Sequence, residues 1–597
     1  MKEYAAPLRD MAFVLRELAT LEEVNRLPGC GEVNLEMAEA ILTEAGKLAS
    51  GVLSPLNPVG DKHGATLKDG EVTTAPGWKD AYRQFVEGGW SSLGSSPEHG
   101  GQGVPRVVSA MVEELWMGAN IAFSLCPMLT HGAIEALELC GSDEQKHTYL
   151  TRLVSGEWPG TMLLTEPQAG SDLAAVRTKA TPRGDGTYAL EGQKIFITYG
   201  EHDLSPNILH LTLARTPTAP PGVKGISLFL VPKFLVNPDG SLGARNDVRC
   251  VSLEHKLGIH GSPTAVLALG DAGGAIGHLV GEENRGIEYM FIMMNAARYG
   301  VGLQGLGVSE RAWQQALWYA RERTQGTELG TRDRTTVPIV RHPDVRRMLL
   351  LMKSQVEAMR AVASVVAASV DRARCHPDPK ERAAALAFVE LMIPVVKGWS
   401  TETSGEVTSL GVQVHGGMGY VEETGAAQLF RDARITPIYE GTTGIQGADL
   451  IGRKVARDGG ATIARVVAEM RAVQAAAAAA GTPDLTAISS SLGEGIDALE
   501  EAARFVVATY GPDVRRAAVG AVPFLMLFGT VAGGWQMARA ALAAQRLLAA
   551  GPDDGFLRAK VKTARFYADQ VLVRAPGLAR TVVAGAEAAL VVEEEYL

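Results

Sequence analysis

The period of the apolar side chains, which changes twice along this chain, is the feature that most constrains its fold. From about residue 34 to residue 155, and again after residue 281, apolar residues recur at the spacing of an α-helix. Between these regions lie short β-branched runs, such as YALEGQKIFIT (188–198), which are separated by Gly, Pro, Asn and Asp. One block of strands between two helical regions predicts an α+β fold that is mainly α.

The same changes divide the 597 residues, which are too many for one hydrophobic core. The short strands predict a compact antiparallel domain, and an Ala-rich composition sets the last helical region apart. The predicted order is an N-terminal extension (1–35), a helical N-terminal domain (36–160), an antiparallel β domain (161–280), a helical bundle (281–458) and an extra C-terminal helical domain (459–597).

Charge and cysteine usage narrow the function classes. The formal net charge of −10 argues against nucleic acid as a partner, because phosphate binding needs clustered Lys and Arg. The cysteines show no CxxC pattern and no metal-ligand spacing, so we expect reduced thiols, a cytoplasmic protein and no metal site. They are Cys30, Cys126, Cys140, Cys250 and Cys375.

Residues 517–537 carry no charge and are numerous enough to span a bilayer. The segment contains Pro523 and four glycines, however, and no comparable stretch accompanies it. We therefore predict a helix that starts at Pro523 and is buried in a core or a subunit interface. Membrane contact is the alternative, and no integral membrane segment is expected.

Common nucleotide, metal and hydrolase motifs are absent from the sequence. The glycine clusters 270–277 and 416–419 do not open a βαβ unit with an acidic residue about 20 positions on, so they are not dinucleotide fingerprints. No P-loop, GxSxG or HExxH occurs. We interpret His260 and His415 as structural or surface residues, and expect neither metal nor Ser-His-Asp chemistry.

Three segments, taken together, are specific. They are LLTEPQAGSD (163–172) followed by EGQKIFITYG (191–200), then YARERTQG (319–326), and finally GVQVHGGMGYVEE (411–423) running into LFRDARITPIYEGTTGIQ (429–446). Their order and spacing resemble the acyl-CoA dehydrogenase family over residues 36–455. The two termini are similar to the long bacterial branch of that family, which includes 3-methylmercaptopropionyl-CoA dehydrogenases.

The resemblance implies a helical N-terminal domain, a central β domain and a C-terminal four-helix bundle, with FAD at their junction in a homodimer. Thr165 would contact the pyrimidine edge of the flavin, where preorganised donors stabilise the charge of reduction. Met162 and Leu164 would pack nearby. Thr198 would lie near flavin N5 and Phe196 would cover one ring face. An alternating strand directs Phe196 and Thr198 toward the same ligand.

The resemblance also places the rest of FAD and the substrate. Arg323, Gln413, Gly416 and Gly417 are similar to residues that hold the FAD pyrophosphate and adenosine, partly from a neighbouring subunit, and Thr442 is assigned to the cofactor as well.

For the substrate, Ser171 resembles a residue that contacts the pantetheine arm, and Arg298 one that approaches CoA. Asn295 stands where several relatives carry Asp. Tyr439 and Gly441 are assigned to the thioester.

Glu440 is the candidate catalytic base. It lies in IYEGTTG, between an apolar strand-like run and a glycine. Burial beside an acyl chain should raise its pKa toward neutrality, which suits a general base. Its backbone N–H, with the flavin ribityl 2′-hydroxyl, would bind the thioester oxygen. Some relatives place the base at the position of Ala297, which cannot act. The alternative is a surface Glu in a loop.

The predicted function is FAD-dependent α,β-dehydrogenation of an acyl-CoA to the trans-2-enoyl-CoA, with electrons passed to an electron-transferring flavoprotein. Medium or long chains and 3-methylmercaptopropionyl-CoA remain open as substrates. An acyl-CoA oxidase using O₂ is the alternative enzyme. A flavin-containing nucleic-acid-binding relative of the adaptive-response type is the alternative of another class, but a basic C-terminal domain would be expected there, whereas this chain ends in EEEYL.

Overall fold

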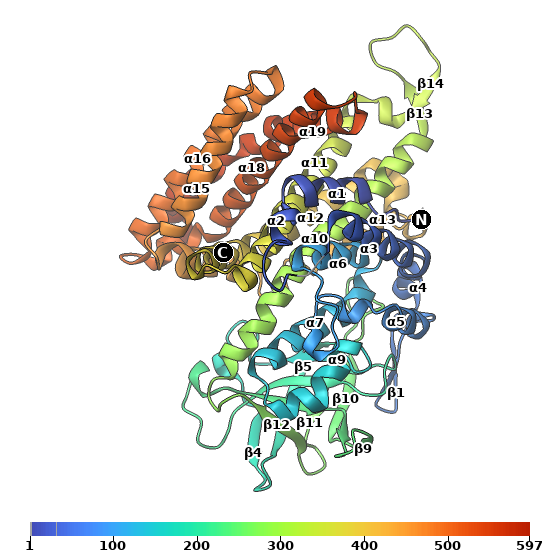
Figure 1. The fold of residues 1–597 in the computed structure, drawn as a ribbon, viewed down its shortest axis with the longest axis vertical. Helices are drawn as coiled ribbons and strands as arrows, with labels where there is room; N and C mark the ends of the chain where they lie inside the picture. Colours follow the sequence, from blue (N-terminus) through green and yellow to red (C-terminus); the bar gives the residue numbers. More distant parts are fainter. Residues whose placement is uncertain (1–2, 31–32) are drawn as a thin grey trace. The chain divides into compact units, whose positions relative to one another are not determined.

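The computed structural model describes residues 3–30 and 33–597 (Figure 1). Contacts divide the chain into two compact units, each built from separate stretches. We call them the β unit (47–104 and 119–300) and the helical unit (1–46, 105–118 and 301–597). A mainly helical chain with one central β domain confirms the predicted fold class. The domain bounds of the sequence analysis remain predictions.

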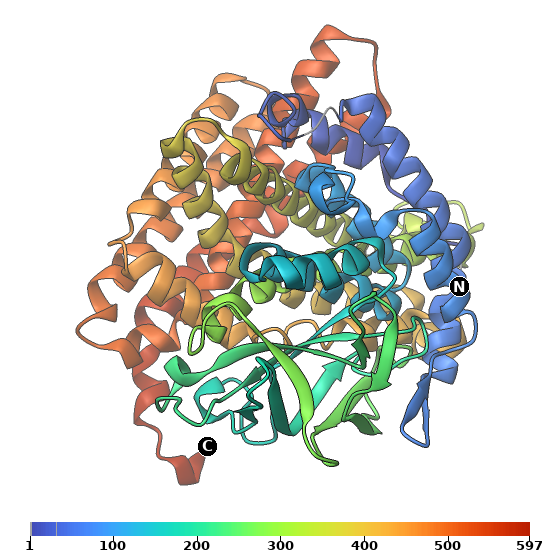
Figure 2. The ribbon, with the colours of Figure 1, turned by 60° about the horizontal axis from the view of Figure 1, so that its bottom comes forward.

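The β unit is organised around one large sheet, whose strands appear in teal and green in Figure 2. Its strands are β3 (Gly160–Leu163), β4 (Lys179–Pro182), β5 (Tyr188–Thr198), β6 (Leu209–Ala214), β7 (Ser227–Pro232), β10 (Val248–Leu253), β11 (Thr264–Leu269) and β12 (Ala275–Val280). The strand order is β10-β11-β5-β12-β7-β6-β3, and β4 pairs with β5.

The predicted antiparallel arrangement holds for every pair of this sheet except one. β3 and β6 are parallel, with Gly160 opposite Leu209 and Leu163 opposite Thr212. Parallel neighbours need a crossover of a dozen or more residues, and the chain between β3 and β6, which contains β4 and β5, supplies it. The short β-branched runs in the sequence identify the strands. Whether β3 and β6 are parallel depends on the chain segment that connects them.

The β unit also contains helices. They include α4 (Ser54–His63), α5 (Trp78–Glu87), α7 (Ile121–Cys140), α8 (Asp143–Gln145) and α9 (Thr151–Ser155). α7 packs against β3. β6, β7 and β11 are buried at every position, so their few polar residues, which include His210 and Thr212 of β6, are buried together with the apolar ones. Two small hairpins complete the unit, β1 (Thr66–Lys68) with β2 (Glu71–Thr73) and β8 (Phe234–Val236) with β9 (Leu242–Arg245).

The helical unit is built on long helices. These are α10 (Gly286–Glu322, from residue 301 onward), α11 (Pro343–Cys375) and α12 (Pro379–His415), joined by α1 (Leu8–Glu17), α2 (Leu21–Val24), α3 (Leu35–Leu48, up to residue 46), α6 (Arg106–Ala119, up to residue 118), α13 (Ala426–Ala433) and α14 (Thr443–Asp449). β13 (Thr324–Thr327) and β14 (Thr336–Pro338) form a hairpin after α10. Val308, Met352, Val407 and Leu429 share one buried core.

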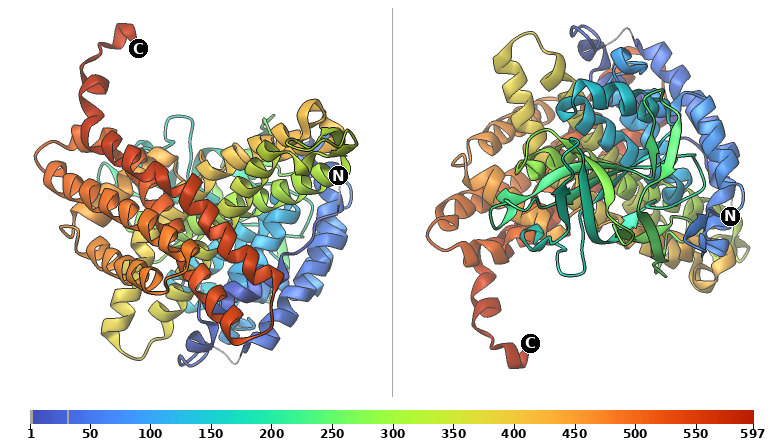
Figure 3. Two further views of the ribbon diagram at one scale, coloured as in Figure 1. Left: turned by 90° about the horizontal axis from the view of Figure 1, so that it is seen from above. Right: turned by 90° about the horizontal axis from the view of Figure 1, so that it is seen from below.

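The remaining helices of this unit pack side by side, in orange and red in Figures 1 and 3. They are α15 (Ala461–Ala479), α16 (Pro483–Tyr510), α17 (Val514–Val519), α18 (Ala521–Ala550), α19 (Gly555–Gln570), α20 (Ala575–Ala584) and α21 (Ala586–Val591). α18 also packs against α11 and α12, so this group of helices covers part of the bundle.

Two helical segments, 379–420 and 521–550, are long and apolar enough to cross a membrane by length and composition. In α18, 83% of the most apolar stretch is buried inside the protein, as the predicted core helix requires. The glycines of the uncharged segment allow close packing: a Cβ on Gly529 would lie 2.1 Å from the Trp399 ring, and one on Gly533 2.4 Å from the Tyr567 hydroxyl. The helix begins at Ala521, two residues before Pro523.

A buried charge cluster joins five helices of the helical unit. Arg360 of α11 donates to Glu114 of α6 (Nε to Oε1, 2.9 Å) and to Glu310 of α10 (Nη2 to Oε2, 2.6 Å). Asp10 of α1 contacts both Arg360 and Lys560 of α19. Burial raises the pKa of Glu114 to about 7, although Arg360 opposes the shift. We call the set the Arg360 cluster: Asp10, Glu114, Glu310, Glu357, Arg360 and Lys560.

Candidate functional site

In the β unit, the predicted flavin-edge residues lie at the end of β3 and just beyond it. Met162 is buried in the strand, and Leu164 and Thr165 are half-buried after it. The Thr165 carbonyl accepts a hydrogen bond from the Ile195 N–H of β5 (2.9 Å). Thr165 therefore belongs to a segment that is tied to β5, the strand that carries Phe196.

A buried ion pair strengthens that connection, and the sequence analysis did not single it out. Glu166 accepts hydrogen bonds from Lys194 Nζ (2.8 Å) and from the Thr178 hydroxyl (2.6 Å). Lys194 also donates to the Leu164 carbonyl (3.1 Å). Burial alone would raise the pKa of Glu166, but the Lys194 ammonium and the donors around it lower this pKa to about 2. Burial lowers the pKa of Lys194 to about 8, so the pair is charged at neutral pH and anchors the loop after β3.

The end of β5 is not the regular alternating strand that we predicted. The pairing with β11 shifts register, so that Ile195 and Phe196 together oppose Val266 in a β-bulge. Phe196 has a φ of 59°, and 59% of its surface is exposed. Ile197 is buried and Thr198 is half-buried. Phe196 and Thr198 therefore still flank the buried Ile197, but the extra residue of the bulge breaks the simple period of two.

Tyr199 holds this strand end in place and was also missed by the sequence analysis. Its backbone is left-handed (φ 51°), which is rare for an aromatic residue, while its side chain is buried. The Tyr199 hydroxyl accepts a hydrogen bond from Trp78 Nε1 (3.1 Å) and donates to the Ala122 carbonyl (2.8 Å). Strained residues persist where their surroundings fix them, and they concentrate at functional sites.

The predicted substrate residues of the β unit are divided between two places. Ser171 is exposed in the loop before the short 3₁₀ turn Leu173–Ala175. Asn295 and Arg298 lie one helical turn apart on α10, and Arg298 Nη1 donates to Asn295 Oδ1 (3.5 Å). Arg298 is buried, and Ala297 beside it is buried too. The helical spacing of NAAR therefore brings Asn295 and Arg298 into contact, so that both could face the same ligand.

In the helical unit, Glu440 lies in a turn and not after a strand-like run. Ile438 and Tyr439 both donate their N–H groups to the Ile435 carbonyl (2.9 and 3.2 Å). Pro437 lacks an N–H and cannot contribute one to a strand ladder, which explains the turn. Glu440 has a φ of 54° and Gly441 a φ of 86°. We call residues 435–442 the Glu440 turn.

Side chains from two helices hold the backbone of the Glu440 turn. Gln446 Nε2 on α14 donates to the carbonyls of Glu440 (3.1 Å) and Gly441 (3.3 Å). Lys397 Nζ on α12 donates to the Gly441 carbonyl (2.7 Å). Thr442 is the N-cap of α14, accepting from the Ile445 N–H (3.3 Å). The Glu440 side chain itself is half-buried.

Tyr439 packs inward next to the candidate base. Its hydroxyl donates to Gln304 of α10. Burial and the charge of Glu440 both raise the pKa of Tyr439, so it stays protonated. Tyr439 therefore anchors the Glu440 turn to α10 and does not act as a base at neutral pH.

The predicted pyrophosphate residues lie at the ends of α10 and α12. Arg323 is exposed directly after α10, and Gln413 is exposed in the last turn of α12. Gly416 (φ 60°) ends α12, and a Cβ on Gly416 or Gly417 would meet nothing within 4 Å, so their backbone is accessible. His415 is buried, with its Nδ1 2.7 Å from the Gly411 carbonyl and its ring stacked 4.5 Å from Tyr319 of α10. This stack brings the two helix ends together.

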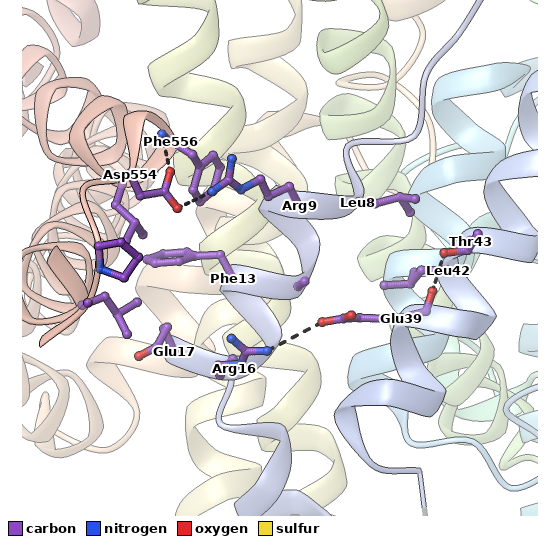
Figure 4. A pocket seen from close by; sticks show the side chains of 15 residues that line it. Leu8, Arg9, Phe13, Arg16, Glu17, Glu39, Leu42, Thr43, Asp554 and Phe556 are labelled. Atoms are coloured by element: carbon purple, nitrogen blue, oxygen red, sulfur yellow. Dashed lines mark hydrogen bonds and ion pairs between the residues drawn. The ribbon is translucent and has the colours of Figure 1, made fainter.

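A cavity of about 650 Å³ in the helical unit contains none of these residues. It is lined by α1, α3 and the connection between α18 and α19, and Figure 4 shows Arg9 bonded to Asp554 and Arg16 to Glu39 across it. Within residues 3–30 and 33–597, no group of three or more His, Cys, Asp or Glu side chains is arranged to hold a metal ion. This cavity therefore contains neither the strained residues Phe196 and Tyr199 of the β unit nor the strained Glu440 of the helical unit.

Four protein-family models match the chain in succession. The model of the acyl-CoA dehydrogenase N-terminal domain matches residues 61–157, the middle-domain model residues 161–272 and the C-terminal-domain model residues 284–456. A further model, described as acetyl-CoA dehydrogenase C-terminal like, matches residues 466–593.

Similar proteins and structures span the whole chain. It is 52% identical to the 3-methylmercaptopropionyl-CoA dehydrogenase of Ruegeria pomeroyi, with 96% of each chain covered. It is 34% identical to the broad-specificity linear acyl-CoA dehydrogenase FadE5 of Mycobacterium tuberculosis, again over 96% of each. A crystal structure of an acyl-CoA dehydrogenase from Bacillus anthracis complexed with FAD shares the fold, with 21% identity, a TM-score of 0.73, and coverage of 96% of this chain and 92% of that one.

Proposed function

Because the chain belongs to the acyl-CoA dehydrogenase family, whose members are oxidoreductases acting on CH–CH bonds of acyl-CoA, we propose that it removes the α and β hydrogens of an acyl-CoA thioester with FAD as cofactor. The product would be the trans-2-enoyl-CoA. One observation carries the proposal: Glu440, the acid of the IYEGTTG motif, lies on a left-handed backbone that side chains of two helices hold.

The residues of the β unit are suited to a planar aromatic cofactor. Phe196 presents an exposed ring on a strained bulge, where it is free to stack on a planar ligand. Thr198 on the same strand and Thr165 on the anchored loop would offer hydroxyl groups to such a cofactor, and Met162 and Leu164 would pack near it. FAD, when bound, accepts the β-hydrogen as a hydride.

The helical unit carries residues suited to the phosphates of such a cofactor. Arg323 provides a guanidinium that can bind a phosphate through paired charge-assisted hydrogen bonds. Gly416 and Gly417 leave their backbone open to close approach, and Gln413 adds a polar side chain beside them. We assign these residues to the pyrophosphate and adenosine, and Thr442 to the cofactor as well.

Glu440 would take the α-proton onto its carboxylate. A carboxylate that is half-buried beside an apolar acyl chain becomes a stronger base than one in water. The Glu440 N–H would hold the thioester oxygen as negative charge develops there. Gly441, at a φ of 86°, leaves room beside the carboxylate, and Tyr439 fixes the turn from within. Ala297 has no acid, so the base cannot come from that position.

For the substrate we propose 3-methylmercaptopropionyl-CoA, because the relative with that activity is 52% identical along almost the whole chain. Ser171 would contact the pantetheine arm, and Arg298 with Asn295 the CoA moiety. Longer straight-chain thioesters are the second candidate, favoured by the FadE5 relative, which is 34% identical. We further propose a cytoplasmic homodimer that passes electrons to an electron-transferring flavoprotein.

An anaerobic screen of acyl-CoA thioesters tests the proposal. The FAD-loaded enzyme should lose its oxidised flavin absorbance fastest with 3-methylmercaptopropionyl-CoA, and more slowly with longer chains. No bleaching with any acyl-CoA would refute the dehydrogenase function, whereas fastest bleaching with a long chain would move the substrate assignment to the second candidate.

The electron acceptor and the assembly need separate measurements. With a saturating acyl-CoA in air, stoichiometric hydrogen peroxide would identify the oxidase alternative, whereas rapid reduction of an added electron-transferring flavoprotein supports the proposal. Sedimentation should show a dimer. A stable tetramer would contradict the proposed homodimer.

A further inference from the structure

Lys397 has an unusual position for a lysine. It lies in the middle of α12, its side chain is fully buried, and its Nζ donates to the Gly441 carbonyl over 2.7 Å. Lysine is almost never fully buried unless a specific partner receives its charge, because removing an ammonium ion from water is costly. Here a partner that the structure identifies is a backbone carbonyl of the Glu440 turn.

The same turn is held from α12 at a second point. The Thr443 hydroxyl donates to Glu402, which lies just over one helical turn beyond Lys397, and the Thr443 N–H donates to the Pro437 carbonyl (3.0 Å). A rigid helix therefore holds the C-terminal end of the turn at two neighbouring points, and the Thr443 N–H closes the turn back onto Pro437. Sites built on rigid elements hold a functional group more accurately than sites on free loops.

Lys397 and Gln446 bind the carbonyls of Glu440 and Gly441, and these two residues of the turn have left-handed backbone. Glu440 and Gly441 have φ angles of 54° and 86°, and their carbonyls receive the three hydrogen bonds described above. In an unsupported loop, Glu440 would relax to a right-handed or extended backbone, which would redirect both its carboxylate and its N–H.

We infer that Lys397 is a positioning residue for the base Glu440, acting through the Gly441 carbonyl, with Gln446 as its neutral counterpart. The inference rests on the proposed function, because it assumes that Glu440 takes the proton. Lys397 has two effects. It keeps the turn in the geometry that aims the carboxylate, and it places a positive charge on the backbone carbonyl of the residue after the base.

The second effect distinguishes positioning from simple stabilisation of the fold. A nearby cation favours the ionised form of a carboxylate, so removal of the Lys397 charge should raise the pKa of Glu440. Other ionisable groups near the turn include Glu402 on α12, Tyr439 within it, Asp432 on α13 and Arg434 directly before it, and none of these residues is replaced in a Lys397 variant. A shift of the pH profile would therefore report the lysine.

The test compares Lys397→Met and Lys397→Gln in the full-length, FAD-loaded enzyme. In Lys397→Met, acyl-CoA should still bind, but anaerobic flavin reduction should slow by about 10²-fold, because displacement of a catalytic group by about 1 Å has that effect. The acid limb of its pH profile should move to higher pH. Lys397→Gln keeps a donor without the charge, so it should recover part of the rate and retain the pH shift.

Lys454→Met is the matched control, since Lys454 is an ion-paired lysine of the same unit (3.0 Å from Glu390) that takes no part in the site. It should behave as the wild type. Wild-type rate and pH profile in Lys397→Met would overturn the inference. If Lys397→Met does not load FAD, Lys397→Gln alone tests the inference. In that case, a wild-type pH profile in FAD-loaded Lys397→Gln would overturn the inference.

Glu440→Gln separates this inference from the proposed function. An inactive Glu440→Gln together with an unaffected Lys397→Met would remove only the role of Lys397. Rapid flavin reduction by Glu440→Gln would remove the base assignment itself, and the positioning role with it.

Discussion

The Glu440 turn and the Arg360 cluster both place charged side chains inside the helical unit, but with opposite consequences for the backbone. In the Arg360 cluster, the charges bind one another and join α1, α6, α10, α11 and α19, which have regular helical backbone. In the Glu440 turn, Lys397 and Gln446 bind backbone carbonyls, and the residue that they hold is strained.

The difference indicates what each region is for. Paired buried charges hold helices in one arrangement, and the loss of one partner leaves the others uncompensated. A strained turn that is held through its backbone positions a side chain for function. Loss of that side chain should lower the reaction rate more than the free energy of unfolding. We therefore expect variants of the Arg360 cluster to lose stability and variants of the Glu440 turn to lose rate.

The largest effect should come from Glu440→Gln. Gln is nearly isosteric and keeps the backbone N–H, so FAD and acyl-CoA should bind, but removal of a general base slows the reaction by about 10²–10⁴-fold. Anaerobic addition of acyl-CoA should shift the flavin spectrum without bleaching it, while the melting temperature stays unchanged. Glu440→Asp should be slower than wild type by about 10²-fold, because its carboxylate lies one methylene too far back.

Glu494→Gln, an exposed carboxylate on α16, serves as the control and should bleach at the wild-type rate. A large fall in melting temperature in Glu440→Gln would break the comparison, because the turn would then serve the fold.

Arg360→Met should give the second-largest effect, and it should lower stability without changing the reaction rate. It leaves Asp10, Glu114 and Glu310 without their shared cation, and breaking a buried pair costs about 3–5 kcal/mol. Urea denaturation should show the loss, whereas the rate of flavin reduction per folded, FAD-loaded enzyme should not change. The control is Arg574→Met, which breaks an exposed pair with Glu406 and should cost about 1 kcal/mol or less. Equal losses in the two variants would contradict the role of the cluster.

Glu114 should make stability depend on pH. Its pKa in the folded protein is about 7, above the ordinary value of 4.5, so the folded state binds more protons than the unfolded state between those values. Stability should therefore fall as pH rises from 4.5 to about 7, by at most about 1.4 kcal/mol per pH unit. Asp10 has a lowered pKa and is ionised in both states throughout this window.

Glu114→Gln should flatten that dependence in denaturation curves recorded from pH 5 to 8. An equally steep curve in the variant would assign the pH dependence to another group. The acid limb of the flavin-reduction profile should stay the same, since the cluster does not touch the site.

Tyr199→Phe should give the smallest effect. It tests whether strained backbone in the β unit, like that of the Glu440 turn, serves the reaction more than the stability of the fold. The variant loses two hydrogen bonds and leaves the Trp78 N–H without that acceptor, a cost of about 1–3 kcal/mol. We expect weaker FAD retention and slower reduction, with a loss of global stability no larger than this cost. Tyr188→Phe, at the other end of β5, loses only a bond to Glu283 and should retain FAD.

Local pattern was sufficient for much of the fold. Helical and strand periods depend on neighbours within a few positions, so they predicted the order of helices, β domain and helices. The uncharged run 517–537 predicted the core helix α18 because an apolar helix must be covered. Motif order was likewise sufficient to identify the family and to single out Glu440, since the residue types of a motif can be read without their coordinates.

Tertiary structure decided what depends on residues far apart in sequence. The bulge that exposes Phe196 arises from pairing with β11. The Glu440 turn (435–442), where an apolar run suggested a strand, is held by α12 and α14. The parallel pair β3 and β6 depends on a crossover. No short window can show these contacts.

The buried charges show the same limit most clearly. Arg360, Lys397 and Lys194 look like ordinary surface cations in the sequence, because charged residues on helices and strands usually face water. Only the packing shows that each is buried against a partner, Arg360 against three carboxylates, Lys397 against the Gly441 carbonyl and Lys194 against Glu166. Composition and period report which side chains prefer water, but the free energy of a buried charge depends on the partner that the fold places beside it.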